Sequence, residues 1–234
     1  MKKNPPMDLG PTLSGCMTSL YKGLKGIYTC FLLGSILVIS SCTFFDLPEE
    51  PGVVLFQDDF SSPNSGWDRY QGSTYISDYT NSSYRIAVLQ ENYEAWALAG
   101  LNFSDAIIEV SATSVKGPED NAYGVICRYQ NPDNYYFFLI SSDGYSGIGV
   151  VYQGQRELLT GESMLPSEAI VTGPLTNLLE VQCVDDTLSI SVNGIEIAEV
   201  KSDLLKSGDV GLITGTYDLQ KTEIIFDNFS VKNP

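Results

Sequence analysis

Short runs of alternating apolar and polar residues dominate the chain after residue 50, and turn-forming residues separate them. A period of two places alternate side chains on opposite faces of a β-strand, whereas the 3.6-residue period of an amphipathic helix is nearly absent. The interruptions read NPDN, SDG, VNG and KSGD, which are typical turn sequences. The pattern predicts an all-β protein with strands at residues 54–60, 75–78, 84–88, 96–101, 106–113, 122–129, 135–141, 147–152, 178–184, 187–192, 195–200, 208–214 and 223–231.

Many short strands joined by hairpins predict two antiparallel sheets packed face to face. The clearest hairpin signal is Val192-Asn193-Gly194, because an Asn-Gly pair suits the left-handed backbone of a two-residue turn. We expect one folded domain over residues 53–234.

The first 41 residues have a different composition and predict a signal helix for export. Lys22 and Lys25 precede the apolar run 26–39, and Ile39-Ser40-Ser41-Cys42 resembles the lipobox of bacterial lipoproteins. We therefore expect residues 1–41 to be a lipoprotein signal peptide, Cys42 to be lipidated, and residues 42–52 to tether the domain outside a bacterial membrane. The alternative is an uncleaved anchor, although the run is shorter than the roughly 20 residues of a spanning helix.

The charge balance and the absence of histidine exclude several function classes. Residues 1–41 hold four of the 13 basic and one of the 29 acidic residues, which leaves 9 and 28, a net charge of −19. Such a surface repels nucleic acid, although acidity also serves solubility alone. With no histidine in the chain, Ser-His-Asp catalysis and histidine-bound zinc are ruled out.

Cysteine usage fits an exported protein. Cys16 and Cys30 belong to the predicted signal, while Cys127 and Cys183 lie in strand-like runs of the domain. Because an oxidising compartment permits pairing, we expect a structural Cys127–Cys183 disulfide; the alternative is a pair of buried thiols.

Several segments together resemble the concanavalin A-like lectin/glucanase jelly roll. They are FQDDFSSPNSGW, NAYGVICRYQNPDNYYFFLISSDGY, LSISVNG, GDVGLITGT and IIFDNFSV. They are similar, more closely, to the bacterial laminin-G-like group that includes 3-keto-disaccharide hydrolase-like domains. The resemblance covers residues 53–234 and implies a jelly-roll sandwich, a fold that hosts lectins, glycosidases and adhesive modules alike.

The resemblance also implies that the first and last strands pair and hold a structural calcium ion. Asp227 matches the last-strand position, and Asp58 or Asp59 supplies the other side. The alternative is that Asp227 ends a strand and bonds the adjacent turn.

Catalysis on this fold needs facing carboxylates, which laminarinase-type hydrolases carry as alternating acids along one strand. Glu109 and Glu180 stand alone in their strands, so that motif is absent. A carboxylate pair built from different strands, around Asp78, Glu91 or Glu94, remains an alternative.

The hairpin at 122–145 supplies the candidate ligand site. If QNPDN forms its turn, Arg128 lies opposite Tyr136 and Cys127 opposite Phe137. Cys127 then faces the core, and the opposite face, the concave groove in lectin-like jelly rolls, carries the aromatic rings that stack on sugars. The candidate ligand-binding residues are Arg128, Tyr136, Phe138, Tyr145 and Trp96. The alternatives are that these rings belong to the core, that Arg128 is a covered ion-pair partner, and that Trp67 caps the sandwich.

Three functional hypotheses follow. The favoured one is a cell-surface lipoprotein that binds a glycan or another extracellular polymer without catalysis. The others are a glycan-acting hydrolase and a structural or adhesive envelope protein without a small ligand. Calcium is the only expected cofactor, the glycan and the membrane are the expected partners, and nucleic acid is not.

Overall fold

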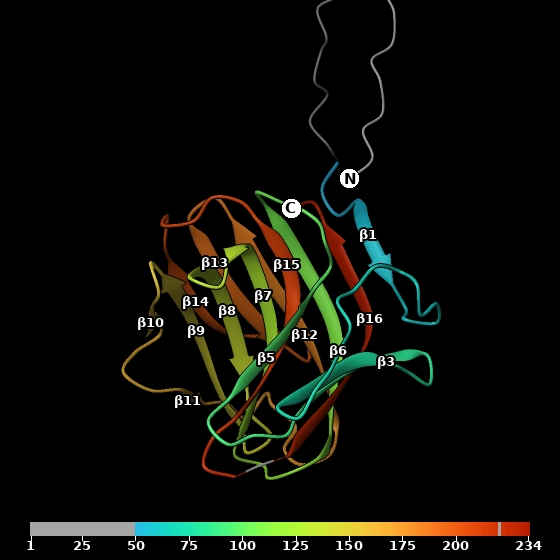
Figure 1. Ribbon diagram of the computed structural model, residues 1–234. Helices are drawn as coiled ribbons and strands as arrows, with labels where there is room; N and C mark the ends of the chain where they lie inside the picture. Colours follow the sequence, from blue (N-terminus) through green and yellow to red (C-terminus); the bar gives the residue numbers. More distant parts are fainter. Residues whose placement is uncertain (1–49, 220) are drawn as a thin grey trace, which may run out of the picture. The chain divides into compact units, whose positions relative to one another are not determined.

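The computed structural model describes residues 50–219 and 221–234, which form two antiparallel β-sheets packed face to face (Figure 1). The predicted all-β, two-sheet architecture is confirmed. The predicted signal helix, Cys42 and most of the predicted tether lie outside the described residues. Within the described ranges, no helix has the length and apolar character needed to cross a membrane.

The larger sheet contains nine strands. Its first and last strands in the sequence, β1 and β16, pair with each other, as the resemblance implied. In spatial order the strands are β14 (Ile195–Lys201), β13 (Thr187–Val192), β12 (Thr176–Val184), β6 (Ala106–Lys116), β16 (Thr222–Lys232), β4 (Ser83–Val88), β3 (Tyr75–Thr80) and β2 (Tyr70–Gln71), with β1 (Val54–Asp58) beside β16.

The smaller sheet contains seven strands and carries the hairpin predicted to bind ligand. Its order is β10 (Gln155–Leu158), β9 (Tyr145–Tyr152), β8 (Asn134–Ile140), β7 (Asn121–Asn131), β15 (Asp209–Thr216) and β5 (Glu94–Leu98), with β11 (Leu165–Pro166) beside β9. β10 and β5 are therefore the two ends of the main strand order.

Each strand predicted from the alternation is present, with boundaries shifted by a few residues. The sequence pattern missed β2, β10 and β11, which span only two to four residues each. Such short pairings are too brief to show a period of two. The predicted hairpin at Asn193-Gly194 joins β13 to β14, and both residues have positive φ, 52° and 81°, as a type I′ turn requires.

The core lies between the sheets and consists of their inward-facing alternate residues. Val125 and Cys127 of β7 and Val181 and Cys183 of β12 are all fully buried in one cluster. The predicted disulfide is confirmed: Cys127 and Cys183 are bonded and link the two sheets covalently.

Candidate functional site

The outer face of the seven-stranded sheet carries a second apolar cluster, separate from the core. On β8, Tyr135, Phe137 and Leu139 point outward, while Tyr136 and Phe138 belong to the core between the sheets. We call this outward surface the outer face. Its remaining members are Ala122, Ile126, Val151 and Ile213, with Trp96, Tyr129, Leu158 and Met164 packed at its margin.

Three aromatic rings form a platform on the outer face. The ring centroids of Trp96 and Tyr135 are 5.9 Å apart, those of Tyr129 and Tyr135 are 5.6 Å apart, and those of Trp96 and Tyr129 are 6.4 Å apart. Tyr135 is buried beneath its neighbours, whereas Trp96 and Tyr129 keep part of their surface exposed. The three residues come from three different strands, β5, β7 and β8, so the platform exists only in the folded sheet.

Glycines let long side chains lie flat across this face. A Cβ at Gly149 would collide with the ring of Phe137, and one at Gly215 would approach Cγ of Glu94 to 3.0 Å. Because neither glycine has a side chain, Phe137 and Glu94 can lie over the neighbouring strand instead of standing away from the sheet.

A bidentate ion pair crosses the outer face. Nη1 and Nη2 of Arg156, on β10, donate to Oε2 and Oε1 of Glu94, on β5, at 2.8 and 2.7 Å. The Arg156 guanidinium also lies 3.8 Å above the centroid of the Phe137 ring, a cation–π contact in the middle of the sheet. We call this Arg156–Glu94 pair the strap.

The strap shows that the outer face is concave. Five strand spacings of about 4.8 Å would put β10 and β5 about 24 Å apart in a flat sheet. An arginine and a glutamate together reach only about half of that distance. The sheet must therefore curve toward its outer face, which turns the platform into the floor of a groove.

The groove shifts the pKa values of its polar groups. Desolvation raises the pKa of Glu94 above its usual value, although the charge and hydrogen bonds of Arg156 act in the opposite direction. Burial, with the nearby Glu94 charge, raises the pKa of Tyr135 to about 12, so its hydroxyl stays neutral. Functional sites and structural ion pairs both shift carboxylate pKa values in this way.

Two hollows extend the groove at the ends of the strands. One, of about 490 Å³, lies beside the platform and is lined by Leu98, Leu101, Asn102, Tyr129, Gln130, Ser207, Gly208 and Asp209. The other, of about 500 Å³, is lined by Asp120, Asn121, Ser141, Asp143, Tyr145, Leu158, Ser163, Met164 and Tyr217. Both combine aromatic or aliphatic surface with amide and carboxylate groups, which suits ligands that carry many hydroxyls.

Of the predicted ligand residues, Trp96 and Tyr145 lie on the outer face. Trp96 is part of the platform, and Tyr145, 42% exposed, lines the second hollow. Their role in binding remains a prediction.

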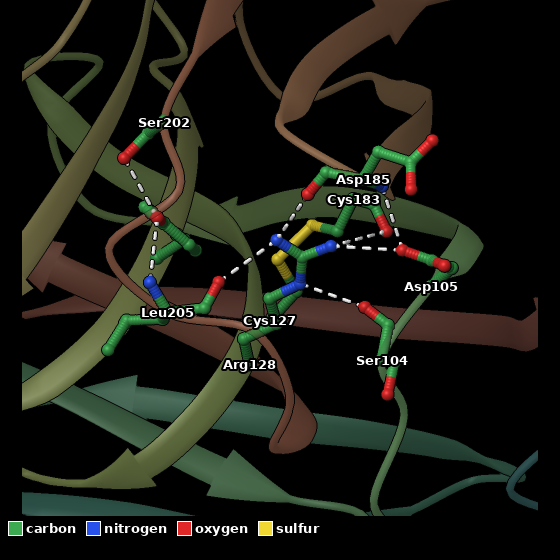
Figure 2. The surroundings of a disulfide bond; sticks show 9 residues. Ser104, Asp105, Cys127, Arg128, Cys183, Asp185, Ser202 and Leu205 are labelled. Carbon is green, nitrogen blue, oxygen red and sulfur yellow. Dashed lines mark hydrogen bonds and ion pairs between the residues drawn. A yellow bond between two sulfur atoms is a disulfide. The ribbon is translucent and has the colours of Figure 1, made fainter.

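The predicted placement of Arg128 on the groove is wrong. Its side chain is 2% exposed, and Figure 2 shows the guanidinium beside the disulfide, enclosed by acceptors from three segments. Those acceptors are the carbonyl oxygens of Ser104, Cys183, Asp185 and Leu205 and the carboxylate of Asp105, at 2.8 to 3.4 Å. Arg128 is therefore a covered ion-pair partner of Asp105, which was the alternative considered for it, and its other hydrogen bonds tie loops together.

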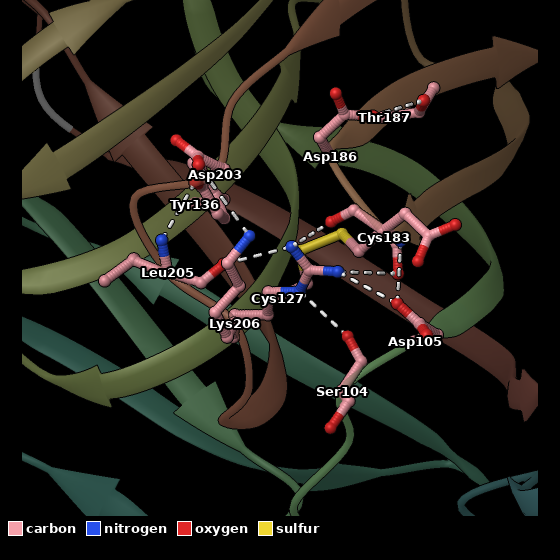
Figure 3. A network of polar contacts seen from close by, with 12 residues as sticks. Ser104, Asp105, Cys127, Tyr136, Cys183, Asp186, Thr187, Asp203, Leu205 and Lys206 are labelled. Carbon is pink, nitrogen blue, oxygen red and sulfur yellow. Dashed lines mark hydrogen bonds and ion pairs between the residues drawn. A yellow bond between two sulfur atoms is a disulfide. The ribbon is translucent and has the colours of Figure 1, made fainter.

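The predicted placement of Tyr136 and Phe138 on the outer face is also wrong, because the register differs by one residue. Cys127, not Arg128, lies opposite Tyr136, and Val125 lies opposite Phe138. Both rings are fully buried in the core. Figure 3 shows Tyr136 near Leu205, whose backbone N–H donates to the Tyr136 hydroxyl at 3.1 Å.

A bulge in β7 causes this shift. Between the Cys127–Tyr136 and Asn131–Asn134 pairs, Arg128, Tyr129 and Gln130 stand against Tyr135 alone. Arg128 adopts a φ of 50°, which is costly for a residue with a side chain. The hydrogen bonds of the Arg128 guanidinium offset that cost. The alternation of apolar residues in the sequence does not reveal the bulge.

The predicted calcium ligands lie near the pairing of β1 with β16, where Asp58 stands opposite Phe229. Asp58 accepts N–H bonds from Phe60 at one oxygen and from the Trp67 indole at the other, and Asp227 accepts from Asn228. Among the described residues no group of three or more acidic, histidine or cysteine side chains could hold a metal ion. Asp58 and Asp59 share a hollow of about 520 Å³ with Glu109, and Asp227 does not line it. The calcium assignment remains a prediction.

Trp67 lies in the core at one end of the sandwich. It is 4% exposed and contacts the rings of Phe60, Tyr84 and Phe229. This position matches the capping alternative and not a role at the edge of the groove.

Sequence reasoning considered Glu94 only as one of several scattered acids, and it missed Arg156, Tyr129, Tyr135 and Phe137. A predicted hairpin register shifted by one residue would have placed Tyr135 and Phe137 on the outer face. Arg156 carried no signal, because its short strand was not predicted and its partner is 62 residues distant in the chain.

Comparison with known proteins supports the fold assignment. No family model matches the chain, and no curated protein is similar to it in sequence. Solved structures do match. The carbohydrate-binding module CBM66 from Bacillus subtilis is 15% identical, with a TM-score of 0.58 over 72% of this chain and 96% of that one. A Bacillus subtilis protein of unknown function with a galectin-like fold is 12% identical, with a TM-score of 0.58 over 78% and 97%.

A non-specific endo-β-1,3(4)-glucanase of family GH16 also matches, with 9% identity and a TM-score of 0.56 over 78% of this chain and 95% of that one. These matches show the fold: the chain is a concanavalin A-like jelly-roll sandwich. At these identities the likeness establishes the fold alone, and the closer similarity to 3-keto-disaccharide hydrolase-like domains remains a prediction.

Proposed function

We propose that this protein binds a glycan in the groove of the seven-stranded sheet. The observation that carries the proposal is the platform of Trp96, Tyr129 and Tyr135 on a concave face. Sugar rings stack their C–H faces on aromatic rings, while carboxylates accept hydrogen bonds from hydroxyls and side-chain amides both accept and donate them. That a carbohydrate-binding module and a glucanase share the fold supports the proposal.

A second candidate function is glycan hydrolysis, which Glu94 favours. Its raised pKa keeps it closer to protonation than an exposed glutamate, as a general acid requires. Binding without catalysis is the first proposal, because the hydrolytic mechanism needs a second carboxylate facing the first across the bond.

We also propose the cellular setting that the sequence suggests: export, lipidation at Cys42 and attachment to the outer side of a bacterial membrane. Mass spectrometry of the protein purified from a bacterial membrane fraction tests this. A diacylated N-terminal Cys42 is expected, and a mature chain that retains residues 1–41 would contradict it.

The glycan proposal is tested by titrating the full chain, in detergent, against a panel of polysaccharides. We expect saturable binding that Tyr129→Ala or Trp96→Ala weakens at least tenfold, about 1.4 kcal/mol. Leu178→Ala, which removes an exposed apolar side chain from the other sheet, is the matched control and should have no effect. Release of reducing ends that Glu94→Gln abolishes would establish the hydrolase instead, and no binding to any glycan would overturn both.

A further inference from the structure

A hollow of about 320 Å³ opens at the flank of the sandwich, where β3 of one sheet approaches β5 of the other. It is lined by Asp68, Arg69, Tyr70, Tyr75, Ser77, Tyr93, Glu94, Ala95 and Trp96. We call it the flank hollow. It adjoins the groove through Trp96 and Glu94 but lies off the sheet, and its volume suits one small ring or chain rather than a polymer.

Three tyrosines of the flank hollow form a ladder of nearly parallel rings. Tyr70 and Tyr75 are stacked, with centroids 4.2 Å apart and planes at 22°, and Tyr75 and Tyr93 are 6.1 Å apart at 26°. Tyr70 is 45% exposed at the mouth. The negative faces of such rings attract cations.

The charged groups of the flank hollow leave one carboxylate uncompensated. Arg69 is bonded to Asp78 at 2.8 Å, and Glu94 is bonded to Arg156. Asp68 accepts only a long bond from the Leu98 N–H, at 3.4 Å, and forms no ion pair among residues 50–219 and 221–234. The hollow therefore presents a net negative charge beside aromatic rings.

The wall of the flank hollow also contains an unsatisfied hydroxyl. Ser77 is 1% exposed, and its Oγ lies beside the Tyr84 hydroxyl but forms no hydrogen bond of good geometry in the described part of the chain. A buried polar atom without a partner costs about 1–3 kcal/mol, so a ligand that donates a hydrogen bond to Ser77 would recover part of that cost. This observation is independent of the charge and of the aromatic ladder.

We propose that the flank hollow binds a primary ammonium group, as carried by an amino sugar. The ammonium has three N–H donors and no acceptor, which matches the Asp68 carboxylate and the Ser77 hydroxyl, and its charge suits the tyrosine ladder. A quaternary ammonium would leave both acceptors unused, and an anion would be repelled by Asp68. The inference stands apart from glycan binding in the groove, although an amino-sugar polymer would serve both sites.

Titration of the full chain with small amines tests the proposal. Glucosamine and ethanolamine are expected to bind saturably, whereas glucose, tetramethylammonium and glucuronate should not bind at ten times the concentration. Fluorescence reports the event, because the chain has two tryptophans, Trp67 in the core and Trp96 in the wall of the hollow. Glucosamine binding more than tenfold tighter than ethanolamine identifies an amino sugar as the source, and equal affinities identify a simple amine.

Variants assign the binding to the flank hollow. Asp68→Asn should lower the affinity for glucosamine at least tenfold, and Ser77→Ala should lower it severalfold. Asp143→Asn, which removes a carboxylate from another hollow, is the control. If Asp68→Asn fails to fold, the exposed Tyr70→Ala serves in its place.

Binding of glucose as tight as that of glucosamine, binding of tetramethylammonium, or no binding of either amine would each overturn the proposal, as would a neutral effect of Asp68→Asn. Tyr129→Ala keeps the two sites distinct: it should weaken polysaccharide binding in the groove at least tenfold and leave amine binding intact.

Discussion

The guanidinium of Arg156 and the carboxylate of Glu94 join β10 and β5, at opposite ends of the strand order of the seven-stranded sheet, through two hydrogen bonds of 2.7 and 2.8 Å. The pair spans the face on which the platform lies, and the side chains are 38% and 29% exposed. A contact of this kind holds the curvature of the sheet. It also limits how deeply a ligand can enter the groove.

We expect removal of Arg156 to destabilise the protein more than removal of the charge on Glu94. Arg156→Gln leaves a desolvated carboxylate without its partner and exposes Phe137, whereas Glu94→Gln leaves a hydrated arginine that can still donate to the amide oxygen. The expected loss in the free energy of unfolding is about 2 kcal/mol for Arg156→Gln, between those of exposed and buried pairs, and close to zero for Glu94→Gln, because desolvation already disfavours the charge on Glu94. Urea denaturation measures both.

The control for the strap is Lys201→Gln, which breaks an ion pair whose side chains are 66% and 48% exposed. Its cost should be below about 0.5 kcal/mol. Equal costs for Lys201→Gln and Arg156→Gln would show that the strap contributes no more than an ordinary surface pair.

The raised pKa of Glu94 predicts a specific pH dependence. Because its pKa is higher in the folded protein than the ordinary 4.5, the folded state binds more protons between the two values. Its contribution to stability is present below 4.5 and is lost as the pH rises through the folded pKa. The stability of the wild type relative to Glu94→Gln should therefore fall as the pH rises above 4.5 and through the folded pKa.

Carbon-13 NMR of the glutamate side chains gives the pKa of Glu94 directly. A titration midpoint above 4.5 is expected. A midpoint below it would mean that the attraction of Arg156 outweighs desolvation.

The alternation of apolar residues was enough to predict the strands and the two-sheet sandwich, because each buried face imposes a period of two. Alternation also identified the core face of β7 correctly, since Val125 and Cys127 are buried there. It could not give the register of β8. That register depends on the bulge at Arg128, whose left-handed backbone depends on acceptors contributed by distant loops.

The groove was harder to predict than the fold for a related reason. Trp96 was found because it lies in a recognisable strand, but the strap joins residues 62 positions apart and exists only because the sheet curves. Curvature leaves no pattern in the sequence. The residues that define the site therefore came mainly from the structure.

Arg128 should prove essential for stability. Arg128→Met leaves four carbonyl oxygens and the Asp105 carboxylate without their donor beside the core, and we expect a loss of about 3–5 kcal/mol. Arg128→Lys retains the charge but offers a single nitrogen, so about half of that loss should remain. Chemical denaturation is the measurement, with the exposed Lys206→Gln as the control.

This prediction also separates the structural role of Arg128 from a role in binding. Any loss of glycan affinity in Arg128→Lys should disappear when it is measured well below the melting temperature of the variant. A stable Arg128→Met variant that has lost affinity would contradict the structural assignment.

The Cys127–Cys183 disulfide should supply a large part of the stability of the sandwich, because it joins the sheets across a sequence separation of 56 residues. Loss of the loop-closure constraint predicts a cost of about 4 kcal/mol for the Cys127→Ala/Cys183→Ala double variant, measured by urea denaturation. Both cysteines are about 1% exposed, so a reductant should reach them only when the sheets separate. The rate of reduction should then equal the rate of unfolding, and reduction of the native protein at a rate proportional to reductant concentration would show that the disulfide opens without unfolding.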